Sequence, residues 1–236
     1  MEIKFNPPAM VQSGNLYGYT MNNPLRYIDP RGLCGDVHPL FTQVGTSGPI
    51  LHYFFGSHQR AHALRNIEFL SERFQVFYAY VMNSYAFAAA WNALPDVVDI
   101  FVVNVHAAPT WTEYFIVSDL SHRTIDTFVF LGCNAGHLNV PDNLANQFLA
   151  NHTITQLVAV DGYHLRGLGP LTGITTSSRY SKEDWFYSYA STRTDPRTGH
   201  QRPRHHRGFM LHSNGQVRSI GQTFVSVNHL LTRIGR

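Results

Sequence analysis

Three nearly continuous apolar runs constrain the fold of this chain more than any other feature. They are VVDIFVVNVH at 97–106, TIDTFVFLGC at 124–133 and TQLVAVDG at 155–162. Strands of this composition are buried on both faces, as happens in parallel sheets that helices cover on each side. The sequence therefore predicts an α/β fold with a mostly parallel central sheet flanked by helices.

The segments between and after these runs predict helices and turns. Apolar residues at helical spacing indicate one long helix or two short ones from Ser57, as N-cap, to Trp91. Another helix is expected in PDNLANQFLAN with Asp142 as its N-cap, and EYFIVS at 113–118 favours a strand in a small hairpin. An Asn-Gly dipeptide at 214–215 between two alternating runs predicts a C-terminal β-hairpin. The last segment, TFVSVNHLLTRI, fits either an amphipathic helix or a strand and turn.

Composition excludes several classes of protein. Hydrophobic residues make up 44% of the 236 residues and charged residues 14%, so neither a disordered chain nor a coiled coil is expected. There is no apolar run of about eighteen residues and no secretory signal at the N-terminus, so we expect no membrane segment and no signal peptide. Two cysteines without a CxxC pair predict no zinc site, and a net charge of +3 does not imply a nucleic-acid partner.

Two residues at the ends of predicted strands carry the chemistry. His106 ends the first apolar run and Cys133 ends the second, so both fall at the carboxyl edge of the sheet, where open α/β sheets bind ligands. An ionised thiol is a good nucleophile, and a nearby imidazole can favour the thiolate or protonate a leaving amine. Gly132, Ala135 and Gly136 would let a substrate backbone approach closely. The pair therefore predicts acyl transfer by a cysteine nucleophile.

The stretch from Val97 to Asp161 resembles the caspase-like cysteine peptidases. In that group the catalytic His follows one apolar strand, and the catalytic Cys ends the next before a small, turn-forming segment, which reads LGCNAG here. The resemblance implies a caspase-like sheet, a dyad of His106 and Cys133, and an oxyanion hole formed by the backbone amides of Ala107 and Cys133. Ala107 stands where the family usually has Gly. No metal or organic cofactor is implied.

Three polar residues near these strand ends form a candidate substrate pocket. They are Asn104, Asn134 and Asp161. Asp161 ends the third apolar run, where it could select a basic side chain of the substrate or cap a turn.

There are two alternatives to this dyad: a purely structural cysteine, and a different histidine as the partner of Cys133. A free cysteine at a strand end is most often a small buried hydrophobe. His122, His137 and His164 compete with His106 as partners of Cys133, and we expect surface or structural roles for them.

The segment NLYGYTMNNPLRYIDPRGL, from Asn15 to Leu33, resembles the closing motif of the RHS/YD-repeat shell of bacterial polymorphic toxins. Proteins of that family end the shell, and are cleaved, at a DPxGL sequence. Here that boundary is formed by Asp29, Pro30, Gly32 and Leu33. The resemblance implies a shell remnant at 1–33 and a toxin domain at 34–236. It also implies synthesis in a bacterial cytoplasm, export or injection by a specialised secretion system, a cognate immunity protein and, in a longer protein, an RHS shell.

The two resemblances together predict an effector toxin whose payload is a cysteine endopeptidase that cleaves proteins in a target cell. Two alternatives stay open. A nuclease-type or nucleic-acid-binding toxin would use the cluster at 200–207, so Arg204 and His205 would matter and Cys133 would not. A noncatalytic toxin remnant would keep the sheet to bind a partner.

Overall fold

The computed structural model describes residues 27–28, 38–166, 174–177, 192–194, 201–203 and 207–235. Its helices are α2 (Arg60–Leu70), α3 (Ser84–Asn92), α4 (Leu144–Asn151) and α5 (Val227–Arg233), with short 3-10 helices at Ser57–Gln59 and Val117–Asp119. The strands of the main sheet are β3 (Thr42–Val44), β4 (Ile50–Phe55), β5 (Gln75–Tyr80), β6 (Val97–Asn104), β7 (Thr124–Phe130), β8 (Thr153–Asp161), β13 (Gly208–Ser213) and β14 (Gln216–Gly221). Smaller strands are β1 (Tyr27–Ile28), β2 (His38–Pro39), β9 (Tyr163–Arg166), β10 (Ile174–Ser177), β11 (Thr192–Thr194), β12 (Gln201–Pro203) and β15 (Thr223–Phe224).

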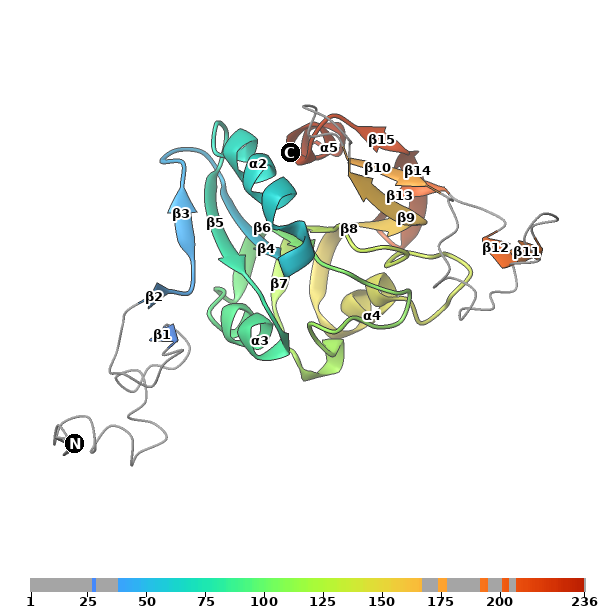
Figure 1. Ribbon diagram of the computed structural model, residues 1–236, viewed down its shortest axis with the longest axis horizontal. Helices are drawn as coiled ribbons and strands as arrows, with labels where there is room; N and C mark the ends of the chain where they lie inside the picture. Colours follow the sequence, from blue (N-terminus) through green and yellow to red (C-terminus); the bar gives the residue numbers. More distant parts are fainter. Residues whose placement is uncertain are drawn as a thin grey trace, which may run out of the picture.

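The main sheet is mixed and has eight strands in the order β14-β13-β8-β7-β6-β4-β5-β3. The five central strands, β8, β7, β6, β4 and β5, are parallel to one another. β3, β13 and β14 each pair antiparallel with their neighbours. The order reverses at β4, because β5 lies on one side of it and β6 on the other (Figure 1). Ligands of open α/β sheets bind beside the carboxyl ends of strands near such a reversal.

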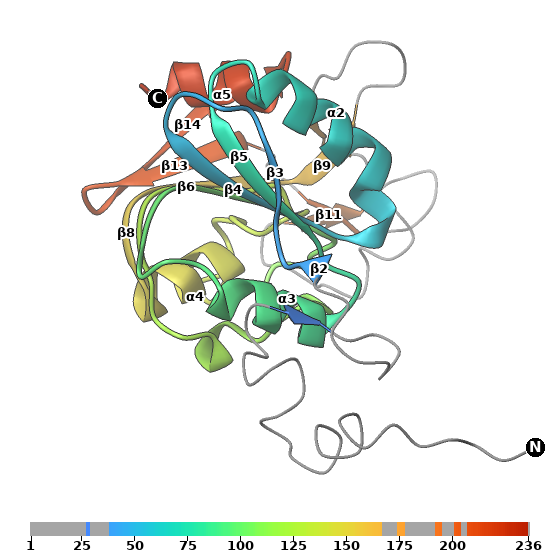
Figure 2. The same cartoon turned by 90° about the vertical axis from the view of Figure 1, so that its left-hand side faces the viewer.

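Helices cover both faces of the main sheet. α2 and α5 lie over one face, and α3 and α4 lie over the other (Figure 2). One apolar core contains Ile67 of α2 and Leu230 of α5, and a second contains Trp91 of α3 and Phe148 of α4. We call these two sides the α2/α5 face and the α3/α4 face.

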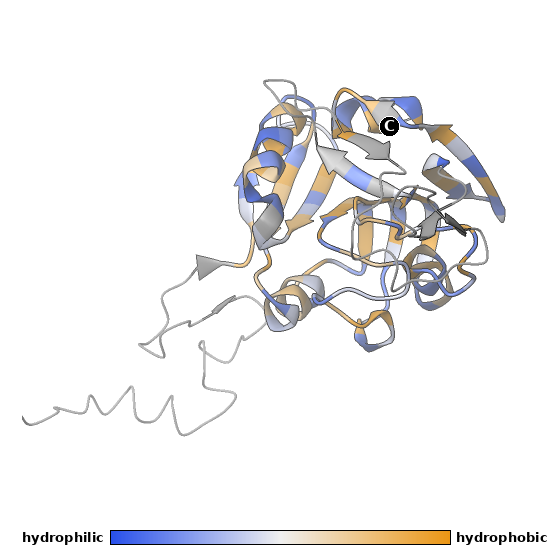
Figure 3. Cartoon of the chain, turned by 45° about the vertical axis from the view of Figure 1, so that its right-hand side comes forward, coloured by the Kyte–Doolittle hydropathy of each residue, from blue (hydrophilic) through white to orange (hydrophobic). Residues whose placement is uncertain are grey.

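The central strands are buried most completely toward their carboxyl ends. The last five residues of β6, the last four of β7 and the last five of β8 are all buried. In Figure 3 these strands are largely apolar, whereas the helices around them carry polar residues on their outer sides. Successive side chains of a strand point to opposite faces, so each buried strand contributes to both cores.

Several sequence predictions are confirmed. The chain is α/β, and the three apolar runs form β6, β7 and β8. The Asn-Gly dipeptide joins β13 to β14 in the predicted hairpin, and its residues have positive φ angles, 52° at Asn214 and 72° at Gly215. A two-residue type I′ turn requires such angles at both positions. The C-terminal segment, which fitted two readings, contains both a strand, β15, and a helix, α5.

Of the two alternatives for Ser57 to Trp91, two short helices are confirmed as α2 and α3, and one long helix is wrong because β5 separates them. α2 ends at Leu70, whose carbonyl accepts hydrogen bonds from the amides of Arg73 and Phe74. The chain then enters β5 between β4 and β3, where its aromatic and β-branched side chains fit a pleated surface. Ser57 begins a 3-10 helix instead of capping α2.

The strand expected at 113–118 is also wrong, because this segment is a loop that ends in the 3-10 helix at Val117–Asp119. β6 and β7 already have strands on both sides, so they offer no free edge for another strand. Tyr114 and Phe115 pack into the α3/α4 core instead.

The N-cap of α4 is Asn143 and not Asp142. The Asn143 side chain accepts a hydrogen bond from the Asn146 amide at 2.9 Å, which satisfies one free N–H of the first turn. The helix therefore begins one residue later than the sequence pattern indicated.

Several predicted features lie outside the described residues. They include the boundary residues Asp29, Pro30, Gly32 and Leu33, and the cluster residues His200, Arg204, His205 and His206. The division of the chain at residue 33 and the nucleic-acid alternative therefore stay predictions. In the part of the chain that the structure describes, no helix is both long and apolar enough to cross a membrane.

Candidate active site

The first part of the candidate site is the turn that follows β6. β6 ends at Asn104, and His106 is exposed to solvent. The His106 carbonyl accepts a hydrogen bond from Thr112 Oγ1 at 2.6 Å, and the Ala108 amide donates to the Trp111 carbonyl at 2.9 Å. These two hydrogen bonds close the turn and fix the backbone that carries the imidazole.

The second part is the turn that follows β7. β7 ends at Phe130, and the amide of Leu131 still donates to the Val103 carbonyl of β6 at 2.7 Å. Cys133 is a free cysteine that is partly exposed, and its Sγ lies 3.9 Å from the carbonyl oxygen of His164. The thiol is therefore neither deeply buried nor in a disulfide, as a nucleophile requires.

The backbone just after Cys133 is held against the end of β8. Asn134 has a positive φ of 55°, which Asn adopts more readily than most residues, and its amide donates to the Gly162 carbonyl at 2.7 Å. The Gly136 amide donates to the Val160 carbonyl at 2.9 Å, and a Cβ at Gly136 would lie only 2.8 Å from the Ala159 Cβ. A larger residue at position 136 would push this turn away from β8.

The register of the sheet relates His106 to Cys133. Val103 of β6 and Phe130 of β7 are paired positions on neighbouring parallel strands, and His106 and Cys133 each follow three residues later. Neighbouring strands lie roughly 4.8 Å apart. Val103 and Phe130 both point into the α3/α4 core.

Packing beyond the strand ends indicates the side to which His106 and Cys133 are directed. Val105 and Ala107 contact the α3/α4 core, whereas Leu131 contacts the α2/α5 core. A Cβ at Gly132 would lie 2.7 Å from the Ala107 Cβ, so the two turns touch on the α3/α4 side. This contact leaves the α2/α5 side for His106 and Cys133.

The Ala107 amide is a candidate oxyanion donor. It donates no hydrogen bond to any residue in the described ranges. A backbone N–H that is held in place without an acceptor can stabilise a developing oxyanion, because it needs no reorganisation during the reaction.

Asn104 and Asn134 bring buried amide groups to the same strand ends. Asn104 is 1% exposed and its Nδ2 donates to the hydroxyl oxygen of Tyr53 at 3.1 Å, while Asn134 is 6% exposed. The Oδ1 atom of each asparagine has no hydrogen-bond partner among the described residues. Buried amide oxygens normally accept a hydrogen bond, so both atoms are unsatisfied in this part of the chain, but each is closed to solvent and a ligand reaches it only when the covering side chains move.

Asp161 is not brought to this surface. Its carboxyl is buried, with Oδ1 3.8 Å from Nδ1 of the fully buried His137. Burial raises the pKa of Asp161 to about 6, although Arg207 opposes the shift, and burial lowers the pKa of His137 to about 4. His137 is therefore neutral near pH 7, and its Nδ1 accepts a hydrogen bond from the Asn139 amide at 3.2 Å, so the two side chains do not form an ion pair. Ala159, two residues earlier, belongs to the α3/α4 core, so Asp161 is directed away from the α2/α5 face.

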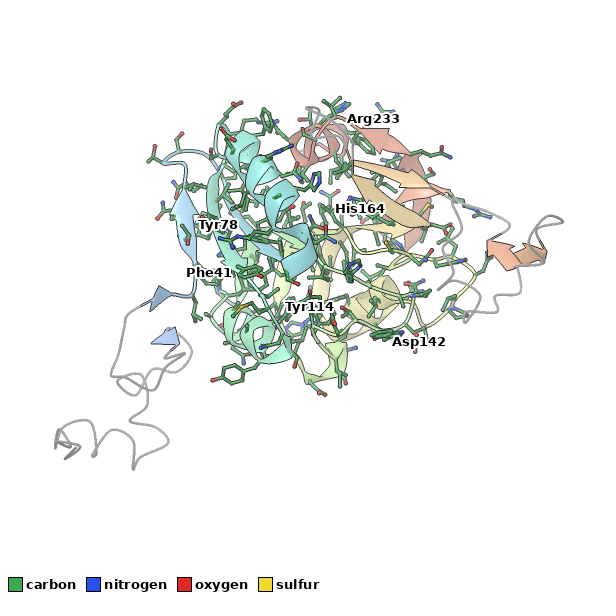
Figure 4. All side chains as sticks on the ribbon, in the orientation of Figure 1. Phe41, Tyr78, Tyr114, Asp142, His164 and Arg233 are labelled. Atoms are coloured by element: carbon green, nitrogen blue, oxygen red, sulfur yellow. The ribbon has the colours of Figure 1, made fainter. Side chains whose placement is uncertain are left out.

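Of the competing histidines, His164 contacts Cys133 through its backbone carbonyl. Figure 4 labels it between α2 and β9. Its ring is buried, with its centroid 6.5 Å from that of Phe209. His122 is exposed just before the start of β7, at the opposite edge of the sheet.

Two supporting residues were not predicted from the sequence. Thr112 holds the His106 carbonyl, and Tyr53 holds the Asn104 amide. The sequence carries little signal for either, because Thr112 lies in a loop without a recognisable motif and Tyr53 belongs to β4, a strand that the patterns did not indicate.

In the described ranges, no group of three or more His, Cys, Asp or Glu side chains is placed to hold a metal ion. No protein-family model, curated protein or solved structure matches this chain.

Proposed function

We propose that this chain is an RHS-type polymorphic toxin effector whose payload is a caspase-like cysteine endopeptidase that cleaves proteins in a target cell. One observation carries the peptidase part of the proposal. His106 and Cys133 follow the paired positions Val103 and Phe130 of neighbouring parallel strands by the same number of residues. The caspase-like resemblance implies this arrangement, with a histidine after one core strand and a cysteine after the next.

The proposed reaction uses the Cys133 thiolate as nucleophile. Its Sγ forms a bond to the carbonyl carbon of the scissile peptide, and the carbonyl oxygen becomes an oxyanion that accepts hydrogen bonds from the Ala107 and Cys133 amides. The His106 imidazolium protonates the leaving amine as the C–N bond breaks, which leaves an acyl-enzyme. A water molecule then gives a proton to His106 and attacks the thioester, which releases the acid and the thiol.

The toxin part of the proposal rests on the segment from Asn15 to Leu33 and its resemblance to the RHS closing motif. It includes a cognate immunity protein and delivery by a specialised secretion system. Asn104 and Asn134 are kept as proposed substrate-contacting residues because their amide oxygens lack partners among the described residues. Asp161 is left out of the proposed pocket because its carboxyl is buried beside His137.

The test is expression of the full chain in bacterial cytoplasm, with growth and newly formed protein N-termini as readouts. We expect Cys133→Ala and His106→Ala each to reduce proteolysis on the order of a thousandfold and to abolish toxicity, because nucleophile and proton donor act as a unit. Far-UV circular dichroism and the thermal midpoint should stay close to those of the unchanged chain.

Control variants distinguish a loss of catalysis from a loss of folding or expression. Cys34→Ala removes the other cysteine, and His122→Ala removes an exposed histidine at the opposite edge of the sheet. Both should keep full activity. Unchanged toxicity of the Cys133→Ala chain, at equal expression, would falsify the peptidase proposal.

A further inference from the structure

A groove lies beside the turn that carries His106. It has a volume of about 590 Å³ and runs between α3 and the loop at 111–120. Its apolar lining includes Tyr85 and Ala88 of α3 and Phe115 and Ile116 of the loop. Tyr114, labelled near α3 in Figure 4, belongs to this same loop and is buried beneath it. Grooves of this size suit a few side chains of a bound ligand.

Two large apolar side chains on this groove are left open to solvent. Tyr85 is 67% exposed and Ile116 is 66% exposed. Loop residues Tyr114, Phe115 and Val117 are buried, so the loop is anchored on its inner side and presents Ile116 outward. Exposed aromatic and aliphatic side chains that gather on a groove commonly mark a contact site for another chain.

The groove is acidic although the chain is basic overall. Glu113 and Asp119 both line it and are exposed, and no Lys, Arg or His from the described residues lines it. The whole chain has a formal net charge of +3. The local charge is therefore opposite in sign to that of the protein, and it complements a ligand that carries Lys or Arg.

The groove shares the loop at 111–120 with the turn that carries His106. Thr112 lines the groove, and its Oγ1 donates the 2.6 Å hydrogen bond to the His106 carbonyl. A segment seated in the groove therefore contacts the loop that fixes the His106 turn, while the imidazole itself is directed to the other face of the sheet.

We infer that this groove is a docking subsite for a cationic, apolar segment of the substrate polypeptide. A Lys or Arg side chain of that segment faces Glu113 and Asp119, and a neighbouring apolar side chain covers Ile116 and Tyr85. The ligand is named as a substrate because of the proposed peptidase function, but its charge and apolar character follow from the groove alone.

Binding is measured on the full chain with Cys133→Ala, so that the probe stays intact. The probe is a fluorescein-labelled peptide of three Leu-Lys dipeptides, and anisotropy reports its binding. Two comparison peptides carry Glu in place of Lys or Ser in place of Leu. We expect only the Leu-Lys peptide to bind well, and its affinity should fall with added salt.

Substitutions in the groove identify the subsite. Glu113→Gln with Asp119→Asn should weaken binding on the order of tenfold, and Ile116→Ser should weaken it by about threefold to tenfold. The control pair Glu68→Gln with Glu72→Gln removes the same charge from exposed positions on and after α2, and Val217→Ser replaces an exposed apolar residue on β14. Both controls should leave binding unchanged.

The outcomes distinguish this inference from the peptidase proposal. Binding that depends on the groove residues supports the subsite even if the unchanged chain cleaves no protein. Equal binding by all groove variants, or equal binding of the Leu-Glu peptide, overturns the subsite even if Cys133-dependent proteolysis is found. A change of oligomeric state in the Ile116→Ser chain, measured by sedimentation, would show that a second copy occupies the groove and would also overturn it.

Discussion

The two edges of the main sheet are built differently. At the amino edge, where β6, β7 and β8 begin, the buried Arg123 guanidinium donates to the carbonyls of His122, Asn92 and Trp91 at 2.8, 3.2 and 3.4 Å. The backbone is bound there as well, because the amides of Thr124 and Thr153 donate to the carbonyls of Asp96 and Arg123. One charged side chain thus ties α3 to the start of the sheet.

The carboxyl edge, where the same strands end, is held by close contacts of small residues. Gly132 lies against Ala107, and Gly136 lies against Ala159. Asn104 keeps a buried amide oxygen without a partner in the described part of the chain. The comparison indicates that a charged side chain and backbone hydrogen bonds close the amino edge, whereas small residues close the carboxyl edge and leave a buried amide oxygen unsatisfied there.

The largest expected effect on stability tests the amino edge. Arg123→Met keeps most of the apolar stem but removes the hydrogen bonds to three carbonyls, so it should lower the free energy of unfolding by about 3 kcal/mol. Urea denaturation measures this value. Asp96→Asn is the control. The Asp96 carboxylate lies 3.5 Å from the guanidinium, but its side chain is 96% exposed, so this substitution should lower the free energy of unfolding by less than about 1 kcal/mol. Equal effects of the two substitutions would contradict the role given to the carbonyl contacts.

The next effect concerns a buried acid at the carboxyl edge. Burial raises the pKa of Asp161 to about 6, so its contribution to folding is fully present below its unfolded value of 3.8 and is lost as the pH rises through about 6. Asp161→Asn should therefore stabilise the protein at pH 7 by about 2 kcal/mol, and this gain should vanish near pH 4. Chemical denaturation across this pH range measures the difference.

The control for Asp161 is Asp142→Asn, which removes an exposed carboxylate and should follow the unchanged chain at every pH. His137 is present in both the unchanged and the Asp161→Asn chains, so its own titration largely cancels in the comparison. A stability difference for Asp161→Asn that does not vary with pH would rule out the buried carboxylate as its cause.

The smallest effect on stability tests the contact between the turns that carry His106 and Cys133. Gly132→Ala would place a Cβ 2.7 Å from the Ala107 Cβ and 2.8 Å from the Phe130 ring, so the turns must separate. We expect activity to fall about tenfold to a hundredfold, because small displacements of reacting groups are costly, with about 1 kcal/mol lost in stability. Peptide hydrolysis and urea denaturation measure the two quantities.

A second substitution makes this test specific. Ala107→Gly in the Gly132→Ala chain removes the opposing Cβ and should restore part of the activity. No recovery in the double variant would mean that the loss comes from the Phe130 ring or from elsewhere, and the contact between the turns would lose its proposed role.

Long apolar runs made the centre of the sheet predictable. β6, β7 and β8 are buried on both faces, so the run itself specifies the strand and its carboxyl end, and with it the positions of His106 and Cys133. β5 was not predictable in the same way, because Phe74 and Phe77 also continue the helical spacing of α2. This segment forms a strand because it pairs with β4 on one side and β3 on the other.

Long-range contacts explain the rest of the site. The sequence indicates an acid at the end of β8, but not that Asp161 faces His137 inside the α3/α4 side of the fold. The consecutive apolar residues at 114–117 resemble a strand, although Tyr114, Phe115 and Val117 instead anchor a loop. Neither the burial of Asp161 nor the loop at 113–118 follows from the local sequence pattern, because each depends on contacts with residues that are distant in the sequence.

The two edge strands of the sheet affect the tendency of the protein to aggregate. β3 has three residues, and β14 carries the exposed Arg218 near its middle. Short and charged edge strands are poor templates for pairing with the sheet of another molecule. Both edge strands of the eight-stranded sheet thus disfavour edge-to-edge aggregation.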